Sequence, residues 1–261
     1  MINILYEDNH IIVVEKKPNI PVCEDESKDK DLLNMIKDYI KEKYNKPGNV
    51  YLGLVHRLDR PVGGIMVFAK TSKAASRLSE QVRTHKLNKV YYAVVDGDVK
   101  NEDRLVDKLL KDHKTNITKV SKDGKESILE YKKIGYKDNF SLVKINLITG
   151  RSHQIRVQFS SRNHALYGDQ KYNKNTKKDN IALFAKQLSF YHPTTQEFLT
   201  FELDLPNRYP FNIFWKIYCV RLKNMLILFW VYTMKKELTK TKFSNNLNNV
   251  FVVPFLVPYF H

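Results

Sequence analysis

Short apolar runs separated by polar turns recur along most of this chain and constrain its fold more than any other feature. Runs of four to ten residues between turn-forming residues predict β-strands. They cover residues 2–6, 11–14, 65–69, 90–95, 127–134, 141–148, 181–190 and 197–203. The last two are expected to pair as a hairpin around residues 191–196.

Helical spacing of apolar residues occurs in three segments between these runs. The segments are residues 29–44, residues 72–85 behind a cap at Thr71 or Ser72, and about residues 152–161. Gly63 and Gly64 are expected to form a turn. Because strands outnumber helices and do not alternate regularly with them, the pattern predicts an α+β fold rather than a doubly wound sheet.

The composition changes after about residue 215. Residues 216–261 carry seven Lys and Arg residues against Glu237 alone, together with an Asn-rich patch and scattered Phe, Val and Pro. We expect one folded domain over residues 1–215 and a basic, partly apolar C-terminal extension over residues 216–261. The extension could include a basic helix at residues 215–236, and it is either an RNA-binding addition or sequence read past the usual end of the domain.

The charge of the chain favours a polyanionic partner. Forty-four Lys and Arg against 28 Asp and Glu give a formal net charge of +16. Such an excess suits RNA, DNA or an anionic membrane surface, although a basic surface can also serve only solubility. The longest apolar run, residues 225–232, is much shorter than the roughly 20 residues that a membrane span needs.

The expected compartment is the cytoplasm. The first residues lack the basic flank and apolar core of a secretion signal. The chain has two cysteines, Cys23 and Cys219, and these cannot form a disulfide framework or a zinc cluster. Such sparse cysteine use is typical of a reducing compartment.

Polar residues gather in a first segment around Asp59, which follows His56, Arg57 and Leu58 and precedes Arg60. An aspartate set between two arginines is expected to be ionised at pH 7, because opposite charges stabilise the carboxylate. An exposed carboxylate in a tight loop suits a nucleophile or a partner for a developing cation. Taken alone, the segment fits a solvated surface loop with an ion pair better than a catalytic site.

Two further segments carry polar residues that a fold alone does not demand. On a strand, Lys89 and Tyr91 share one face, where the tyrosine can stack on a base or handle a proton; the alternative is an ordinary core strand. At residues 147–156 a strand ends and a helix begins. Arg151, His153 and Gln154 add side-chain donors there, so the segment suits an anion or is simply a capped helix start.

Together, the blocks of the chain resemble the RluA-type RNA pseudouridine synthases. The matching blocks are His56-Arg57-Leu58-Asp59 with Gly64, Lys89-Val90-Tyr91, Thr149 to Arg156, Gly168-Asp169-Gln170-Lys171-Tyr172 and His192-Pro193, in the order and spacing of that family. The resemblance covers roughly residues 2–212. It implies a mixed, largely antiparallel sheet flanked by helices and loops, and a catalytic domain over residues 1–215.

The resemblance also implies the activity and the site. A uridine in ribosomal or transfer RNA would be flipped out and isomerised to pseudouridine by a monomer that needs no metal or cofactor. Asp59 takes the place of the essential aspartate, Tyr91 that of the tyrosine on the uracil, and Arg156 that of the basic partner of the aspartate. The residues expected to bind substrate are His56, Arg57, Leu58, Arg60, Lys89, Arg151, His153 and Gln154. Arg57 would fill the gap left by the flipped nucleotide.

The chain departs from the family pattern beside Asp59. Val62 and Gly63 stand where Thr-Ser is common, which removes two hydroxyls, and Gln158 stands where a histidine is frequent. We expect no small RNA-binding domain before the catalytic core, because the pattern begins at Ile2. The alternatives are a non-catalytic RNA-binding protein on the same scaffold, which loss of Asp59 would favour, and an unrelated basic protein.

Overall fold

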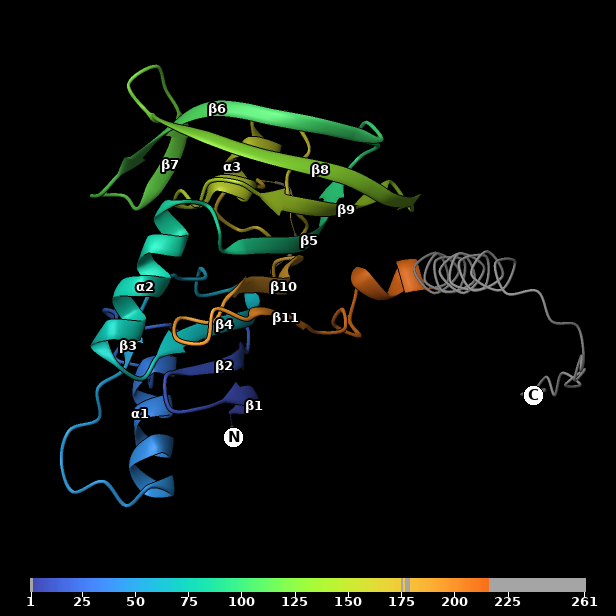
Figure 1. Cartoon of the computed structure of the whole chain (residues 1–261). Helices are drawn as coiled ribbons and strands as arrows, with labels where there is room; N and C mark the ends of the chain where they lie inside the picture. Colours follow the sequence, from blue (N-terminus) through green and yellow to red (C-terminus); the bar gives the residue numbers. More distant parts are fainter. Residues whose placement is uncertain (1, 175, 177–178, 216–261) are drawn as a thin grey trace, which may run out of the picture. The chain divides into compact units, whose positions relative to one another are not determined.

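The computed structural model describes residues 2–174, 176 and 179–215. The expected C-terminal extension at residues 216–261, with the helix considered at residues 215–236, lies outside the described residues except for Trp215. Within the described part, eleven strands form one continuous sheet (Figure 1).

The sheet is mixed and largely antiparallel. Its main path is β1-β2-β4-β10-β5-β9-β8-β6-β7, with β3 paired to β4 and β11 to β10. Only β4 and β10 pair in parallel among these strands. The strand bounds are β1 Asn3–Glu7, β2 Ile11–Lys16, β3 Gly53–Leu54, β4 Gly63–Ala69, β5 Asn88–Asp96, β6 Glu102–Asp112, β7 Ile117–Val120, β8 Lys125–Lys137, β9 Phe140–Leu147, β10 Leu183–Tyr191 and β11 Phe198–Glu202. The α+β prediction and the predicted hairpin of β10 with β11 are confirmed.

Three α-helices and one short 3-10 helix accompany the sheet in the described part. Helix α1 (Leu32–Lys43) begins after Asp31, whose carboxylate accepts a hydrogen bond from the Asn34 amide. Helix α2 (Ser72–Arg83) is capped in the same way by Thr71. Helix α3 (Gln154–Ser160) is shorter than predicted, because His153 adopts a left-handed backbone conformation, and the 3-10 helix spans Phe211–Phe214.

Two hydrophobic clusters cover the two faces of the sheet. Alternate residues of β2 divide between them: Ile12 and Val14 belong to one cluster, and Ile11 and Val13 to the other. The first cluster holds the buried residues of α1 together with Ile155 and Phe159 of α3, so both helices pack on the same face. Helix α2 and partly buried residues of β11 pack on the opposite face. None of the helices described here is long and apolar enough to cross a membrane.

The predicted turn at Gly63 and Gly64 is wrong, because both residues begin β4, beside β10. Gly64 has a φ of 132°, and a Cβ at this position would collide with the carbonyl group of Ala185. A glycine is therefore required where these parallel strands approach closely. Strand β6 was not predicted, because its exposed residues are largely charged and hide the apolar alternation. Strand β7 was not predicted, because it has four residues and only Thr118 among them is buried.

Candidate active site

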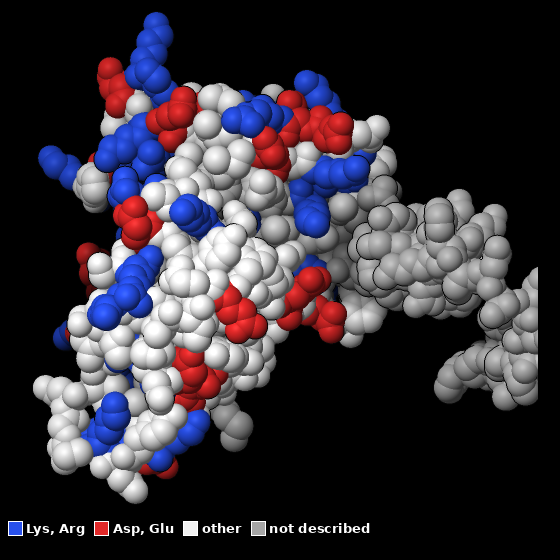
Figure 2. Space-filling view, viewed as in Figure 1, with Lys and Arg blue, Asp and Glu red and all other residues white. Residues whose placement is uncertain are grey.

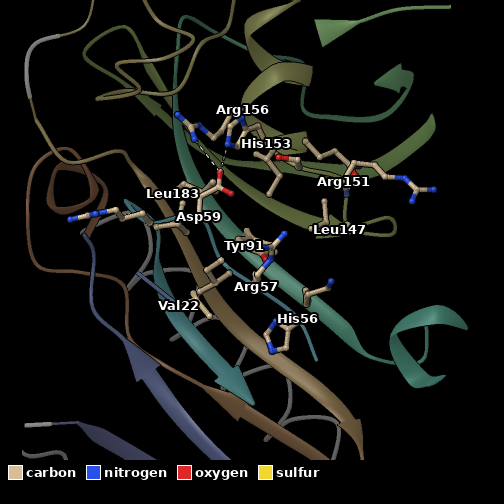
Figure 3. A pocket seen from close by; sticks show the side chains of 18 of the residues that line it. Val22, His56, Arg57, Asp59, Tyr91, Leu147, Arg151, His153, Arg156 and Leu183 are labelled. Atoms are coloured by element: carbon tan, nitrogen blue, oxygen red, sulfur yellow. Dashed lines mark hydrogen bonds and ion pairs between the residues drawn. The ribbon is translucent and has the colours of Figure 1, made fainter. Parts of the chain in front are cut away.

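A cavity of about 1000 Å³ opens beside the centre of the sheet. Its wall comes from the loop between β3 and β4, from β5, and from the segment that joins β9 to α3. All the residues predicted to be catalytic or to bind substrate line this cavity. Figure 3 shows Asp59, Arg57, Tyr91 and Arg156 around the same space. The fold thus brings together segments that are about 90 residues apart in sequence.

Asp59 pairs with a cation from α3 and not with its two arginine neighbours in sequence. Arg156 Nη1 donates to Asp59 Oδ2 at 3.1 Å (Figure 3). The other side of the guanidinium is held by Asp169, through bonds of 2.8 Å from Nε and 2.6 Å from Nη2. Arg156 and Asp169 are buried. The second carboxylate oxygen of Asp59, Oδ1, has no hydrogen-bond partner among the described residues.

His153 lies on the same side of Asp59 as Arg156. Its Nε2 is 3.9 Å from Asp59 Oδ2, and its Nδ1 is 2.6 Å from the hydroxyl oxygen of Tyr172. Burial lowers the pKa of His153 to about 4 against the opposing charge of Asp59, and the charges of Arg156 and Lys171 act in the same direction as burial. The imidazole is therefore neutral at pH 7.

Tyr91 forms part of the cavity wall on β5 and is 6 % exposed. Burial raises the pKa of its phenol above the ordinary value of about 10, and the negative charge of Asp59 raises it further. The ring is consequently a neutral, protonated phenol at pH 7. It offers a flat aromatic surface beside the carboxylate.

Lys16, at the end of β2, holds the loop that carries Asp59 through hydrogen bonds to its backbone. The buried Nζ of Lys16 donates to the carbonyl oxygens of Arg60 at 2.8 Å, Val62 at 2.7 Å and Lys17 at 3.2 Å. Burial lowers the pKa of Lys16 to about 7, although Asp59 acts in the opposite direction. The lysine therefore fixes the backbone that follows Asp59.

Three residues predicted to bind substrate line the cavity and also make structural contacts. His56 accepts a hydrogen bond from the Val67 amide at Nε2, and burial lowers its pKa to about 3. Leu58 belongs to the hydrophobic core. Gln154 accepts from the Arg151 amide and from a threonine hydroxyl, and its amide nitrogen donates to two oxygens. Buried polar groups need such partners, so the polar identity of Gln154 and the Nε2 acceptor of His56 serve the fold. Nδ1 of His56 is buried without a hydrogen-bond partner among the described residues.

The guanidinium of Arg60 lines the cavity but already has hydrogen-bond partners within the protein. It donates to Asp25 and Asp29, and to the hydroxyl of Ser27 at 2.8 Å. The loop that supplies these partners also places Glu24 and Asp25 at the cavity wall. An acidic segment therefore borders a cavity that is otherwise rich in cations.

Several cationic side chains of the cavity have hydrogen-bond donors that no described residue occupies, so they can bind a ligand. Arg57 is exposed and makes no hydrogen bond or ion pair within the described residues. Lys89 also lines the cavity, and the Arg151 side chain donates to the Glu126 carbonyl oxygen and to no other group in the described part of the chain. Figure 2 shows Lys and Arg interspersed with Asp and Glu on the end of the molecule where β6 to β8 lie. A polyanion would therefore meet positive charge chiefly inside the cavity.

Four site residues received no role from the sequence. Asp169 and Tyr172 hold Arg156 and His153, Lys16 holds the Asp59 loop, and Lys111 lines the cavity from β6. A signal existed for the first two, because both belong to the block from Gly168 to Tyr172 that carries the family resemblance. Lys16 and Lys111 have no such signal, since only the tertiary structure brings them to the site.

Comparison with known proteins agrees with the geometry. Residues 10–161 match the RNA pseudouridylate synthase family. An uncharacterized RNA pseudouridine synthase of Aquifex aeolicus is 34% identical over 224 residues, which cover 80% of this chain and 71% of that protein. The ribosomal large subunit pseudouridine synthase D of Zymomonas mobilis is 32% identical over 221 residues, which cover 78% of this chain and 69% of that protein.

A solved structure shares the fold. Human RNA pseudouridylate synthase domain containing 4 aligns with a TM-score of 0.66 at 21% identity, over 78% of this chain and 88% of that chain. The expected pseudouridine synthase core is therefore confirmed. The matched family, the relatives and the fold lead to one conclusion: this chain belongs to the RluA-type family of RNA pseudouridine synthases.

Proposed function

We propose that this RNA pseudouridine synthase isomerises specific uridines of large-subunit ribosomal RNA, and that Asp59 is its essential carboxylate. The relative from Zymomonas mobilis is named for the ribosomal large subunit, which favours this target over transfer RNA. The observation that carries the chemistry is the ion pair of Asp59 with the buried Arg156 in a cation-lined cavity.

Phosphate contacts would hold the RNA over the cavity. Cations of the wall without a carboxylate partner in the described structure are Arg57, Lys89, Lys111, Arg151 and Lys171. Each cation that meets a phosphate releases counterions, so affinity should fall steeply with salt. The same contacts position the RNA without reading its sequence.

The uridine would reach Asp59 by leaving its stack, at a cost of a few kcal/mol. A cavity of about 1000 Å³ lies at the upper end of the roughly 300–1,000 Å³ usual for ligand sites, so it has room for one nucleotide and part of the adjoining backbone. The guanidinium of Arg57 is free and planar, and would stack in the vacated position. Tyr91 would lie against the flipped uracil as a neutral ring.

The reaction breaks the N1–C1′ bond, turns the uracil and joins C5 to C1′. The C5 proton is lost, and N1 ends with a proton. Arg156 and His153 lie beside Oδ2 of Asp59, which leaves Oδ1 open to the substrate. This oxygen would attack the ribose or begin the reaction by another route, and Arg156 would orient the carboxylate in either case.

Mapping of pseudouridines in cells that lack the protein tests this proposal. We expect one or a few positions of large-subunit ribosomal RNA to revert to uridine, while transfer RNA stays unchanged. Plasmid-borne wild type should restore these positions, and Asp59→Ala should not. Restoration by Asp59→Ala, or loss confined to transfer RNA, would contradict the proposal.

A further inference from the structure

Tyr172 lies in a second layer behind Asp59. Its hydroxyl oxygen is 2.6 Å from His153 Nδ1, and the two rings meet edge to face with centroids 5.5 Å apart. The tyrosine ring also lies under the guanidinium of Arg156, at 5.1 Å from its centroid. One side chain thus contacts both residues that flank Oδ2 of Asp59.

The hydrogen bonds around Tyr172 determine which group accepts a hydrogen bond from its hydroxyl. The backbone amide of Thr118, on β7, donates to the hydroxyl oxygen at 2.9 Å. The phenol stays protonated at pH 7, because burial raises its pKa. His153 Nδ1, at 2.6 Å, is the acceptor that the described residues place at hydrogen-bond distance from the hydroxyl oxygen. The buried Thr118 hydroxyl also faces the phenol and lowers its pKa, as a donor does. Tyr172 is therefore the donor in this contact.

This direction fixes the tautomer of His153. A neutral imidazole carries one N–H, so a ring that accepts at Nδ1 carries its proton at Nε2. Nε2 is the atom 3.9 Å from Asp59 Oδ2. The N–H of a neutral ring consequently lies on the side of the carboxylate that Arg156 already occupies.

The backbone supports the same orientation. His153 has φ 53° and ψ 21°, a left-handed conformation that residues with a β-carbon rarely adopt. Such conformations persist where the surrounding contacts determine them. Here the contacts are the Tyr172 hydroxyl on one nitrogen and the neighbourhood of Asp59 on the other.

We propose that Tyr172 is a positioning residue, which holds His153 as the Nε2–H tautomer and so places a neutral donor beside the carboxylate of Asp59. Arg156 is hydrogen-bonded to Oδ2 and this donor lies 3.9 Å from the same oxygen, so the other oxygen remains open toward the substrate. The proposal rests on the proposed role of Asp59. It adds a residue that acts without touching the RNA.

Tyr172→Phe is the test variant, because it keeps the ring beneath Arg156 and removes only the hydroxyl. The first readout is the ¹⁵N spectrum of the histidine rings at pH 7, with His153 assigned by comparison with His153→Ala. We expect the wild type to show an unprotonated Nδ1 and a protonated Nε2. In Tyr172→Phe, the Nδ1 signal should move and the two tautomers should mix.

The second readout is single-turnover release of tritium from a large-subunit ribosomal RNA transcript labelled at C5 of uridine. Tyr172→Phe should slow release by up to about tenfold, the loss expected for one neutral hydrogen bond. The Kd for the transcript should change less than twofold. Tyr6→Phe is the matched control, because it removes a hydroxyl that donates to Asp8 away from the cavity, and it should leave both values unchanged.

A double variant separates positioning from packing. In a His153→Ala background, Tyr172→Phe should slow release no further, because the hydroxyl acts through His153. An unchanged His153 spectrum in Tyr172→Phe, or a further tenfold loss in the double variant, overturns the proposal. Failure of the Asp59 assignment is distinguishable, since Asp59→Ala would then stay active while the spectrum still reports the Tyr172 contact.

Discussion

The buried Asp169 accepts two hydrogen bonds from the Arg156 guanidinium, at 2.8 Å from Nε and at 2.6 Å from Nη2. The third guanidinium nitrogen, Nη1, donates to Asp59 Oδ2 at 3.1 Å. One buried guanidinium thus joins a structural carboxylate to the proposed catalytic one. Arg156 can orient Asp59 because Asp169 prevents it from turning away.

Removal of Asp169 should damage stability and activity together. Loss of one partner leaves Arg156 buried without its main counter-charge, which typically costs about 3–5 kcal/mol. We expect Asp169→Ala to lower the free energy of unfolding in urea by about this amount and to abolish measurable tritium release. Glu80→Ala breaks the exposed pair with Arg83 and should cost no more than about 1 kcal/mol. Equal effects of the two variants would contradict this account.

His56 should make the protein less stable in mild acid. Its pKa is lowered by burial to about 3, whereas in the unfolded chain it is about 6.5. Below pH 6.5 the unfolded chain binds a proton that the native protein excludes, so stability falls as the pH falls toward 3. His153, with a pKa lowered to about 4, contributes in the same direction.

Urea unfolding between pH 7 and 5 measures this effect. Relative to His56→Gln, the wild type should lose up to about 1.4 kcal/mol more per unit of pH below 6.5. The glutamine can still accept from the Val67 amide but does not titrate. Parallel pH profiles for the two proteins would show that His56 is not buried as a neutral ring.

The acidic loop beside the cavity should weaken RNA binding by occupying Arg60. Asp25→Asn with Asp29→Asn frees the guanidinium for a phosphate. We expect the Kd for the transcript to fall by roughly threefold to tenfold, and the plot of log K against log salt to steepen by about one. Asp38→Asn with Glu42→Gln makes the same change of charge on α1, away from the cavity, and should alter neither value as much. If the two pairs of substitutions behave alike, net charge explains the effect and Arg60 does not.

Arg57 should matter only where a base must leave a stack. Arg57→Ala is expected to slow modification of a folded hairpin by about tenfold, since stacking on a base is worth roughly 1–3 kcal/mol. Modification of an unstructured oligonucleotide should slow by much less. Arg83→Ala removes another cation of the cavity wall and should affect both RNAs to the same degree. Equal losses for Arg57→Ala on both substrates would argue against the stacking role.

The local sequence pattern predicted where the helices and strands lie better than it predicted how the strands pair. The spacing of Leu32, Ile36 and Ile40 predicts α1, and all three are buried. Gly63 and Gly64 suggested a turn, but glycine also occurs where two backbones approach closely. Only the pairing of β4 with β10 shows that the second reason applies here. Strand β6 escaped detection because charged residues occupy its solvent-facing positions.

The site shows the same limit. The family resemblance singled out residues of the cavity, but residue identity alone does not say which polar atoms are already satisfied. Gln154 and Arg60 are the examples, since partners distant in sequence or on another loop occupy them. The pairing of Asp59 with Arg156 joins residues 97 positions apart, so spacing could not predict it.

Single-turnover modification by Asp59→Ala tests the central claim most directly. The assay compares tritium release from the labelled ribosomal transcript with the Kd for the same transcript. We predict that release becomes undetectable, while the Kd stays within about threefold because phosphate contacts dominate affinity. Tritium release at a rate near that of the wild type would contradict the account.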